Sequence, residues 1–118
     1  MTAYDQNNVF ARILRKEIPA KIVHEDARCI AFRDVSPQAP THVLVIPKQA
    51  LPGLAQAQRS DEALLGHLLL VAAEIARQEG LETAGYRTVI NSGKNAGQTV
   101  AHLHVHLLGG RALGWPPG

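Results

Sequence analysis

The segment from His102 to Leu108 alternates histidine with aliphatic residues and reads His102-Leu103-His104-Val105-His106-Leu107-Leu108. Successive residues of a β-strand point to opposite faces of the sheet, so this alternation predicts a strand with three imidazoles on one face and aliphatic side chains on the other. The three rings would form a row about 13 Å long, because residues two apart are separated by roughly 6.6 Å. A whole face of titratable rings indicates a ligand site, whereas a single such histidine is more often a hydrogen-bonded structural residue.

Other short runs rich in β-branched residues predict further strands, each bounded by turn-forming residues. We expect these strands at Lys21–His24, Cys29–Asp34, Thr41–Ile46 and Tyr86–Asn91, with the histidine strand at 102–108. A short amphipathic helix is expected from Val9 and ends before Ile18-Pro19. A long helix is expected from an N-cap at Ser60 to a stop at Gly80.

These elements predict an α+β fold with a five-stranded antiparallel sheet, one long helix and one short helix. The 118 residues suit one domain that spans residues 1–118. Residues 1–8 are polar and expected to be frayed, and residues 109–118 are expected to form an irregular C-terminal tail.

The composition excludes several classes of partner. Ten acidic and twelve basic residues leave a formal net charge of +2, and the basic residues are scattered, which argues against nucleic acid or a membrane surface as a partner. Cys29 is the one cysteine, so neither an intramolecular disulfide nor a cysteine-based zinc cluster is expected. Its apolar neighbours indicate a small buried side chain, and the absence of a signal-like segment predicts a cytoplasmic location.

Two chemistries could use the histidine row. Neutral imidazoles are common zinc ligands, but three rings along one strand would have to bend toward one point. Phosphate chemistry uses the row more directly, because one imidazole can attack phosphorus while its neighbours hydrogen-bond to non-bridging oxygens. The preceding loop supports phosphate binding, since Gly93 and Gly97 permit close backbone approach to an anion, although a simple turn would also explain it.

Beyond the histidine row, several segments are shared with a known family. They are Asp34–His42, Asn91, Gly97-Gln98-Thr99, Gly109-Gly110-Arg111 and Trp115-Pro116-Pro117-Gly118. Together with residues 102–108, they resemble the Hint (histidine triad nucleotide-binding) branch of the histidine triad (HIT) family. The resemblance runs from about Phe10 to the C-terminus.

The resemblance implies a homodimer whose sheets join and which hydrolyses purine nucleoside phosphoramidates, such as AMP linked to an amine or to lysine. AMP, GMP and their phosphoramidates are the implied ligands, with no cofactor and no metal. By position, His104 would be the nucleophile, and His42 would support the triad. His102 and His106 would bind or polarise the phosphate and fix the orientation of the nucleophile. Thr99, often serine in this branch, keeps the hydroxyl expected near the leaving group.

The resemblance also implies a nucleotide-binding set. Asp34 would accept hydrogen bonds from the ribose, and Asn91, Gly97, Gln98 and Thr99 would hold the phosphate. The remaining members are Phe10, Ile13, Phe32 and Val35 as apolar walls, and Val105 beside the catalytic histidines His104 and His106.

Three alternatives to phosphoramidate hydrolysis stay open at this point. They are dinucleoside polyphosphate hydrolysis, as in a sister branch, a non-catalytic nucleotide-binding or scaffold protein, and a histidine-bound zinc protein. His24 and His67 match no motif and are expected at the surface or at an interface.

Overall fold

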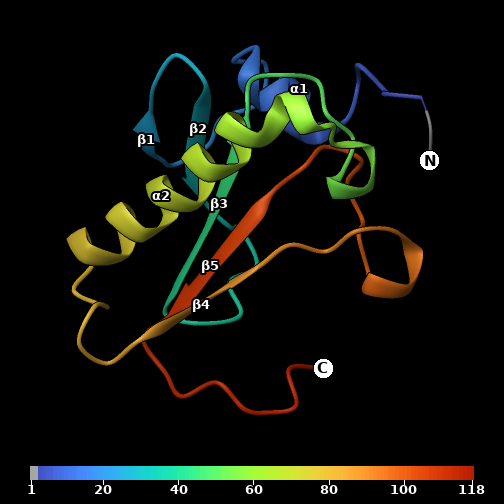
Figure 1. Ribbon diagram of the computed structural model, residues 1–118. Coiled ribbons are helices and arrows are strands. Elements are labelled where there is room, and N and C mark those ends of the chain that lie inside the picture. The colour runs from blue at the N-terminus through green and yellow to red at the C-terminus, as the bar shows by residue number, and fades with distance from the viewer. Residues whose placement is uncertain (1–2) are drawn as a thin grey trace.

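The five strands of the protein form one antiparallel sheet in the order β1-β2-β3-β5-β4 (Figure 1). The structure is a computed structural model that describes residues 3–118. The strands are β1 (Ile22–Glu25), β2 (Cys29–Arg33), β3 (Thr41–Pro47), β4 (Tyr86–Val89) and β5 (Val105–Gly109). This arrangement confirms the predicted α+β fold, and it places β5 between β3 and β4 in the interior of the sheet.

Two helices pack on this sheet, the short α1 (Val9–Leu14) and the long α2 (Glu62–Gln78). The side chain of Asn8 caps α1 by accepting a hydrogen bond from Ala11 N at 2.9 Å. Gly80 ends α2 as predicted, because its φ of 75° is a left-handed conformation that glycine adopts without strain. In residues 3–118 we find no helix with the length and apolarity needed to cross a bilayer.

The predicted N-cap of the long helix was wrong by one residue. Ser60 lies inside a 3₁₀ turn, η2 (Arg59–Asp61), and Asp61 occupies the N-cap position of α2. Two more 3₁₀ turns, η1 (Leu54–Gln56) and η3 (Lys94–Ala96), lie in the connections before α2 and before β5.

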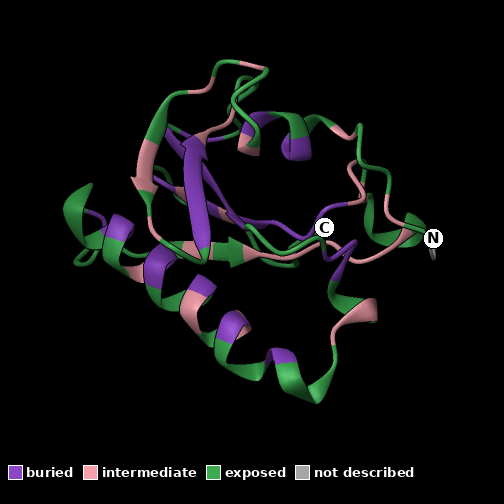
Figure 2. Ribbon diagram, turned by 90° about the horizontal axis from the view of Figure 1, so that it is seen from above, coloured by how far each residue is buried: buried purple, intermediate pink, exposed green. Residues whose placement is uncertain are grey.

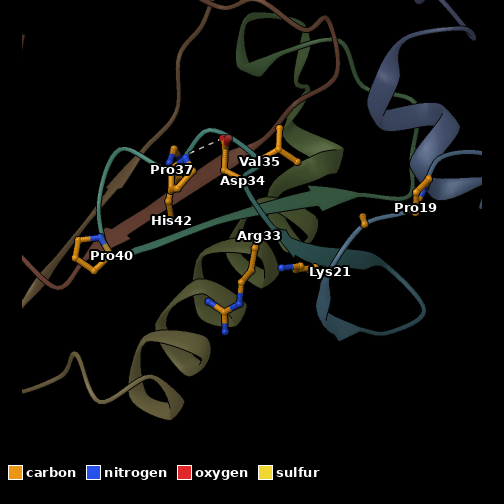
Figure 3. A pocket seen from close by; sticks show the side chains of 9 residues that line it. Pro19, Lys21, Arg33, Asp34, Val35, Pro37, Pro40 and His42 are labelled. Carbon is orange, nitrogen blue, oxygen red and sulfur yellow. Dashed lines mark ion pairs between the residues drawn. The ribbon is translucent and has the colours of Figure 1, made fainter.

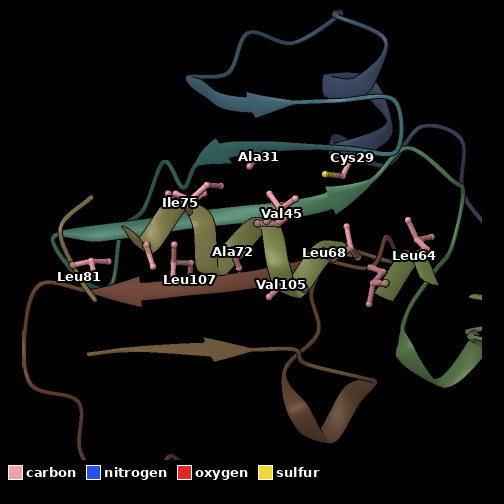
Figure 4. Close-up of a cluster of buried hydrophobic side chains, with 14 of the residues drawn as sticks. Cys29, Ala31, Val45, Leu64, Leu68, Ala72, Ile75, Leu81, Val105 and Leu107 are labelled. Carbon is pink, nitrogen blue, oxygen red and sulfur yellow. The ribbon is translucent and has the colours of Figure 1, made fainter. Parts of the chain in front are cut away.

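The sheet has an apolar core on each face because its central strands are buried on both sides. Toward α2, alternate residues such as Ala31, Val45 and Leu107 pack against the buried stripe of the helix (Figure 4). The outer face of α2 is largely exposed (Figure 2). On the opposite face, Ile30 and Leu44 belong to a second cluster that includes residues of α1. Along each central strand, the residues between those that face α2 therefore face α1.

The histidine strand begins later than the sequence predicted. β5 starts at Val105, and the backbone N–H of Leu103 donates to Leu51 O at 2.7 Å instead of to a neighbouring strand. Residues 102–104 therefore approach the sheet as an extended segment that is not part of the ladder. The straight 13 Å row of imidazoles is consequently broken between His102 and His104.

Candidate active site

A cavity of about 370 Å³ lies between α1 and the face of the sheet that carries the histidines. Most residues predicted to bind the nucleotide contribute to its wall, namely Phe10, Ile13, Phe32, Asp34, Val35, Thr99, His104 and His106. The wall is largely apolar, and its polar members are Arg33, Asp34, Thr99, His104 and His106. Such a cavity suits a flat apolar ring with a polar substituent at one end.

His104 is oriented by its own strand. Its Nδ1 lies 2.7 Å from the carbonyl oxygen of His102, so Nδ1 carries the proton and donates it to that oxygen. The other ring nitrogen, Nε2, is therefore unprotonated in the neutral imidazole. Phe10 packs edge-on against the His104 ring, with centroids 4.9 Å apart, and restrains its rotation. The geometry presents Nε2 as a nucleophile.

A chain of hydrogen bonds fixes the proton on His106. The backbone N–H of Gln38 donates to His42 Nδ1 at 3.0 Å, so the proton of neutral His42 is on Nε2. That Nε2 lies 2.9 Å from His106 Nδ1 and donates to it, which leaves the proton of His106 on its own Nε2. His106 Nε2 is buried and has no partner among the described residues. An orphaned buried donor beside a nucleophile is suited to bind an anionic oxygen.

His102 has a different environment from the other two histidines of the motif. It is fully buried, its Nε2 donates to the carbonyl oxygen of Pro47 at 2.8 Å, and its Nδ1 accepts from the Tyr4 hydroxyl at 2.5 Å. Both ring nitrogens are thus occupied, and His102 does not line the cavity. The structure gives it a supporting position, with its carbonyl oxygen orienting His104.

Burial keeps the histidines of this site neutral. Desolvation is the largest cause that lowers the pKa of His42, His102 and His104 below the ordinary 6.5. The pKa of His106 falls to about 4, because burial is reinforced by the neighbouring His104 and His42. The carboxylate of Asp34 opposes this trend, but only partly. A neutral His104 retains the Nε2 lone pair that nucleophilic attack requires.

Asp34 and Val35 stand between the cavity and a neighbouring hollow of about 640 Å³ (Figure 3). The carboxylate of Asp34 points toward His42, with Oδ2 3.5 Å from Nε2, and its Oδ1 accepts from the Ser36 backbone N–H at 2.8 Å. Val35 is 97% exposed, so this apolar side chain forms the rim of both hollows.

The loop before β5 contributes less directly to the cavity than the sequence suggested. Gln98 Oε1 accepts from Gly93 N at 2.9 Å, and Nε2 donates to the carbonyl oxygens of Pro52 and Val100. The Gln98 side chain therefore fixes the loop. Thr99 lines the cavity, but Asn91 and Gly97 lie outside its wall, so their contact with phosphate stays a prediction.

Val105 requires a correction. Its side chain is 1% exposed and belongs to the core under α2, on the face opposite the cavity. The strand alternation that directs His104 and His106 toward the cavity directs Val105 away from it. Its side chain is therefore structural, and only its backbone remains near the site.

Comparison with known proteins identifies the family. The model of the HIT domain matches residues 15–113 of the chain. The chain belongs to the HIT family. Among curated HIT relatives, a HIT-like protein of Synechococcus elongatus is 63% identical over 96% of this chain and 98% of its own length. A maize protein named the 14 kDa zinc-binding protein is 54% identical over 97% of this chain and 90% of its own.

Solved structures confirm the HIT fold. A HIT family hydrolase from Legionella pneumophila superposes with a TM-score of 0.93 at 47% identity, covering 95% of this chain and all of that one. A histidine triad protein from Clostridium difficile gives a TM-score of 0.90 at 36% identity, covering 95% and 97% of the two chains. The chain therefore has the fold of HIT family hydrolases.

Tyr4 is the residue of the HIT site that the sequence analysis missed. Residues 1–8 were expected to be frayed, and residues 1–2 lie outside the described part of the chain. Tyr4, however, donates to buried His102, and Asn8 caps α1. A lone tyrosine in a polar segment carries no periodicity, so the sequence offered no signal for this contact.

Replacing Tyr4 by phenylalanine should reveal the strength of this contact. Tyr4→Phe leaves His102 Nδ1 buried without a donor, and we expect a loss of about 1–3 kcal/mol in the free energy of unfolding. Urea unfolding measures this loss, with Tyr86→Phe as the matched control because Tyr86 is 39% exposed on β4. Equal stability of the two variants would show that the Tyr4 hydroxyl does not hold His102.

Proposed function

We propose that this HIT protein hydrolyses the P–N bond of adenosine 5′-monophosphoramidates, in which AMP is joined to an amine or to the side chain of lysine. The observation that carries the proposal is the pairing of His104 with His106. One presents an unprotonated Nε2, and the other presents a buried Nε2–H without a described partner. The ring centroids of the two residues are 5.0 Å apart, so both can face one phosphate.

The reaction would proceed in two steps. His104 Nε2 attacks the α-phosphorus, the P–N bond breaks, and the amine leaves with a proton taken from solvent, while AMP becomes bonded to His104. Water then attacks the same phosphorus and gives up a proton to solvent, which releases AMP and restores the imidazole. His106 Nε2–H would donate to a non-bridging oxygen as negative charge develops. Thr99, exposed at the cavity wall, is the hydroxyl that we place beside the departing amine.

The shape of the cavity supports a purine nucleotide as the substrate. Phe10, Ile13 and Phe32 supply apolar surface, and Asp34 supplies a carboxylate near the end of the cavity that holds the histidines. A purine would pack between the apolar side chains, and the ribose hydroxyls would donate to Asp34. Apolar walls grip adenine and guanine alike, so AMP and GMP derivatives are both proposed ligands.

Replacing His104 by alanine should abolish turnover. In a single-turnover reaction with a fluorogenic adenosine phosphoramidate, we expect His104→Ala to lose at least about 10⁴-fold in rate, because the bond to phosphorus cannot form. AMP binding should persist, since the apolar walls remain. His67→Gln, altered on α2 outside the cavity, is the matched control and should react like the wild type.

The same experiment, repeated with a chelator and with other substrates, distinguishes phosphoramidate hydrolysis from the alternative functions. Release of amine in the presence of a chelator, together with AMP-histidine trapped on wild-type protein, is the expected result. The maize relative is named for zinc, so abolition of activity by the chelator would favour metal-dependent chemistry instead. Faster cleavage of dinucleoside polyphosphates would favour the sister activity, and AMP binding without turnover would leave a nucleotide-binding or scaffold role.

The pH dependence tests the neutral state of His104. Its lowered pKa means that protonation, which removes the attacking lone pair, occurs only below the ordinary value of 6.5. The single-turnover rate should therefore stay level as pH falls through 6.5 and decline only at lower pH. A decline centred at 6.5 or above would contradict a desolvated nucleophile. Because His42, His104 and His106 interact, the measured midpoint belongs to the cluster.

We also propose that two subunits form a homodimer by joining their sheets. β4 is an edge strand of the sheet, and edge strands offer unpaired backbone groups to another chain. The outer face of α2 exposes Leu69 (45%) and Leu70 (72%), which a partner subunit would cover.

Sedimentation at micromolar concentration should give about twice the chain mass of 12.7 kDa. We expect Leu70→Glu to shift the protein toward monomer, because a charge would be buried in the interface. Leu54→Glu is the matched control, since Leu54 is 40% exposed on η1. A monomeric wild type would refute the dimer.

A further inference from the structure

A second cluster of histidines surrounds the carboxylate of Asp26, outside the candidate active site. His24 Nε2 and His67 Nε2 each lie 2.7 Å from Asp26 Oδ2, and the Cys29 sulfur lies 3.4 Å from the same oxygen. The chain has six histidines, and the other four belong to the active-site region. His24 and His67 are thus drawn to one point although they are 43 positions apart in the sequence.

Four separate pieces of the fold deliver these side chains. His24 lies on β1, where the pairing with β2 shifts register between Ile22 and His24, and such an irregularity re-aims a side chain. Asp26 follows in the turn, Cys29 begins β2, and His67 lies on α2. Asp26 Oδ1 accepts the backbone N–H groups of Arg28 (2.8 Å) and Cys29 (2.9 Å), so the carboxylate is held with Oδ2 toward the histidines.

The donor set is one that zinc and similar cations prefer, because it combines two imidazoles, a carboxylate and a thiol. Ligand atoms of His24, Asp26 and Cys29 lie within 4.8 Å of one another. The thiolate and carboxylate would together neutralise a divalent charge. Cys29 would bind as a thiolate, because a coordinating cation deprotonates a thiol.

The cluster is also accessible to an ion. The side chains of His24, Asp26 and His67 are 24%, 28% and 23% exposed, whereas Cys29 is buried beneath them. Zinc bonds of about 2.0 Å to nitrogen and oxygen would separate tetrahedral ligand atoms by about 3.3 Å. The 2.7 Å contacts of the two imidazoles with Asp26 would have to widen by less than an ångström. His67, which lies outside the group of three already within 4.8 Å, would also have to move toward His24 and Cys29 by rotation of its partly exposed imidazole.

We propose that His24, Asp26, Cys29 and His67 form a binding site for one zinc-type divalent cation. Each imidazole would shift its proton from Nε2 to Nδ1, Cys29 would release one proton to solvent, and the cation would replace the hydrogen bonds that now converge on Oδ2. The ion would tie β1 and β2 to α2. Its role would be structural, and the site is separate from the chemistry assigned to His104.

The decisive experiment measures zinc and cobalt binding to the purified full chain and its variants after removal of metal. The triad region contains another potential metal group, Asp34, His42 and His106, so His106→Gln is the matched control for that region. The test variants are His24→Gln and His67→Gln, which change partly exposed side chains, and Cys29→Ala. Circular dichroism and the phosphoramidase assay of the metal-free His24 and His67 variants serve as folding controls.

We expect wild type and His106→Gln to bind one equivalent of zinc with a rise in melting temperature. His24→Gln and His67→Gln should bind at least about tenfold more weakly, since even loss of a residue outside the coordination sphere can cost that much. Cobalt should show a thiolate-to-metal absorption band that Cys29→Ala removes. Zinc binding lost in His106→Gln but kept in His67→Gln, no uptake by wild type, or cobalt bound without the thiolate band would each overturn the proposed site.

Discussion

The hydrogen bond from the Gln38 backbone to His42 is the constraint on which the active site depends. A backbone N–H can only donate, so His42 Nδ1 must accept, and the direction of each following hydrogen bond is fixed. The proton on His106 consequently faces away from His42. A second backbone group, the carbonyl oxygen of His102, fixes the opposite tautomer on His104. Two neighbouring imidazoles thus acquire different roles, acceptor and donor, from main-chain polarity alone.

The two-faced sheet explains why these rings can be buried without losing their function. Core residues such as Val43 and Leu107 hold β3 and β5 against α2, while the alternating positions carry His42 and His106 on the opposite face. The short α1 covers that face only partly, with Phe10 against His104. Burial lowers the pKa values of the histidines, and the incomplete cover leaves space for a ligand. One strand therefore supports both the stability of the core and the chemistry of the site.

Sequence periodicity was sufficient for the strands, for α2 and for the face that carries His104 and His106. It was insufficient where the backbone departs from regular structure. The backbone hydrogen bond from Leu103 N to Leu51 O keeps residues 102–104 out of the pairing between β-strands. This separates His102 from the row formed by His104 and His106. Tyr4 reaches His102 across 98 positions, and the Gln98 side chain reaches the Pro52 carbonyl oxygen across 46. Such contacts depend on tertiary packing, which the local spacing of residues in the sequence does not predict.

The two histidine clusters differ in the group that accepts hydrogen bonds from the imidazoles. This difference determines whether each cluster suits an anion or a cation. In the active site, burial holds each imidazole neutral, and no described residue accepts the proton of His106 Nε2. That arrangement favours an incoming anion. Around Asp26, the imidazole nitrogens converge on a carboxylate whose pKa is held well below its ordinary value by hydrogen bonds from His24, the backbone and His67. A carboxylate surrounded by two imidazoles and a thiol favours a cation once each imidazole proton has moved to Nδ1 and the thiol proton has left. The same residue type therefore supports opposite ligand charges on the two faces of one small sheet.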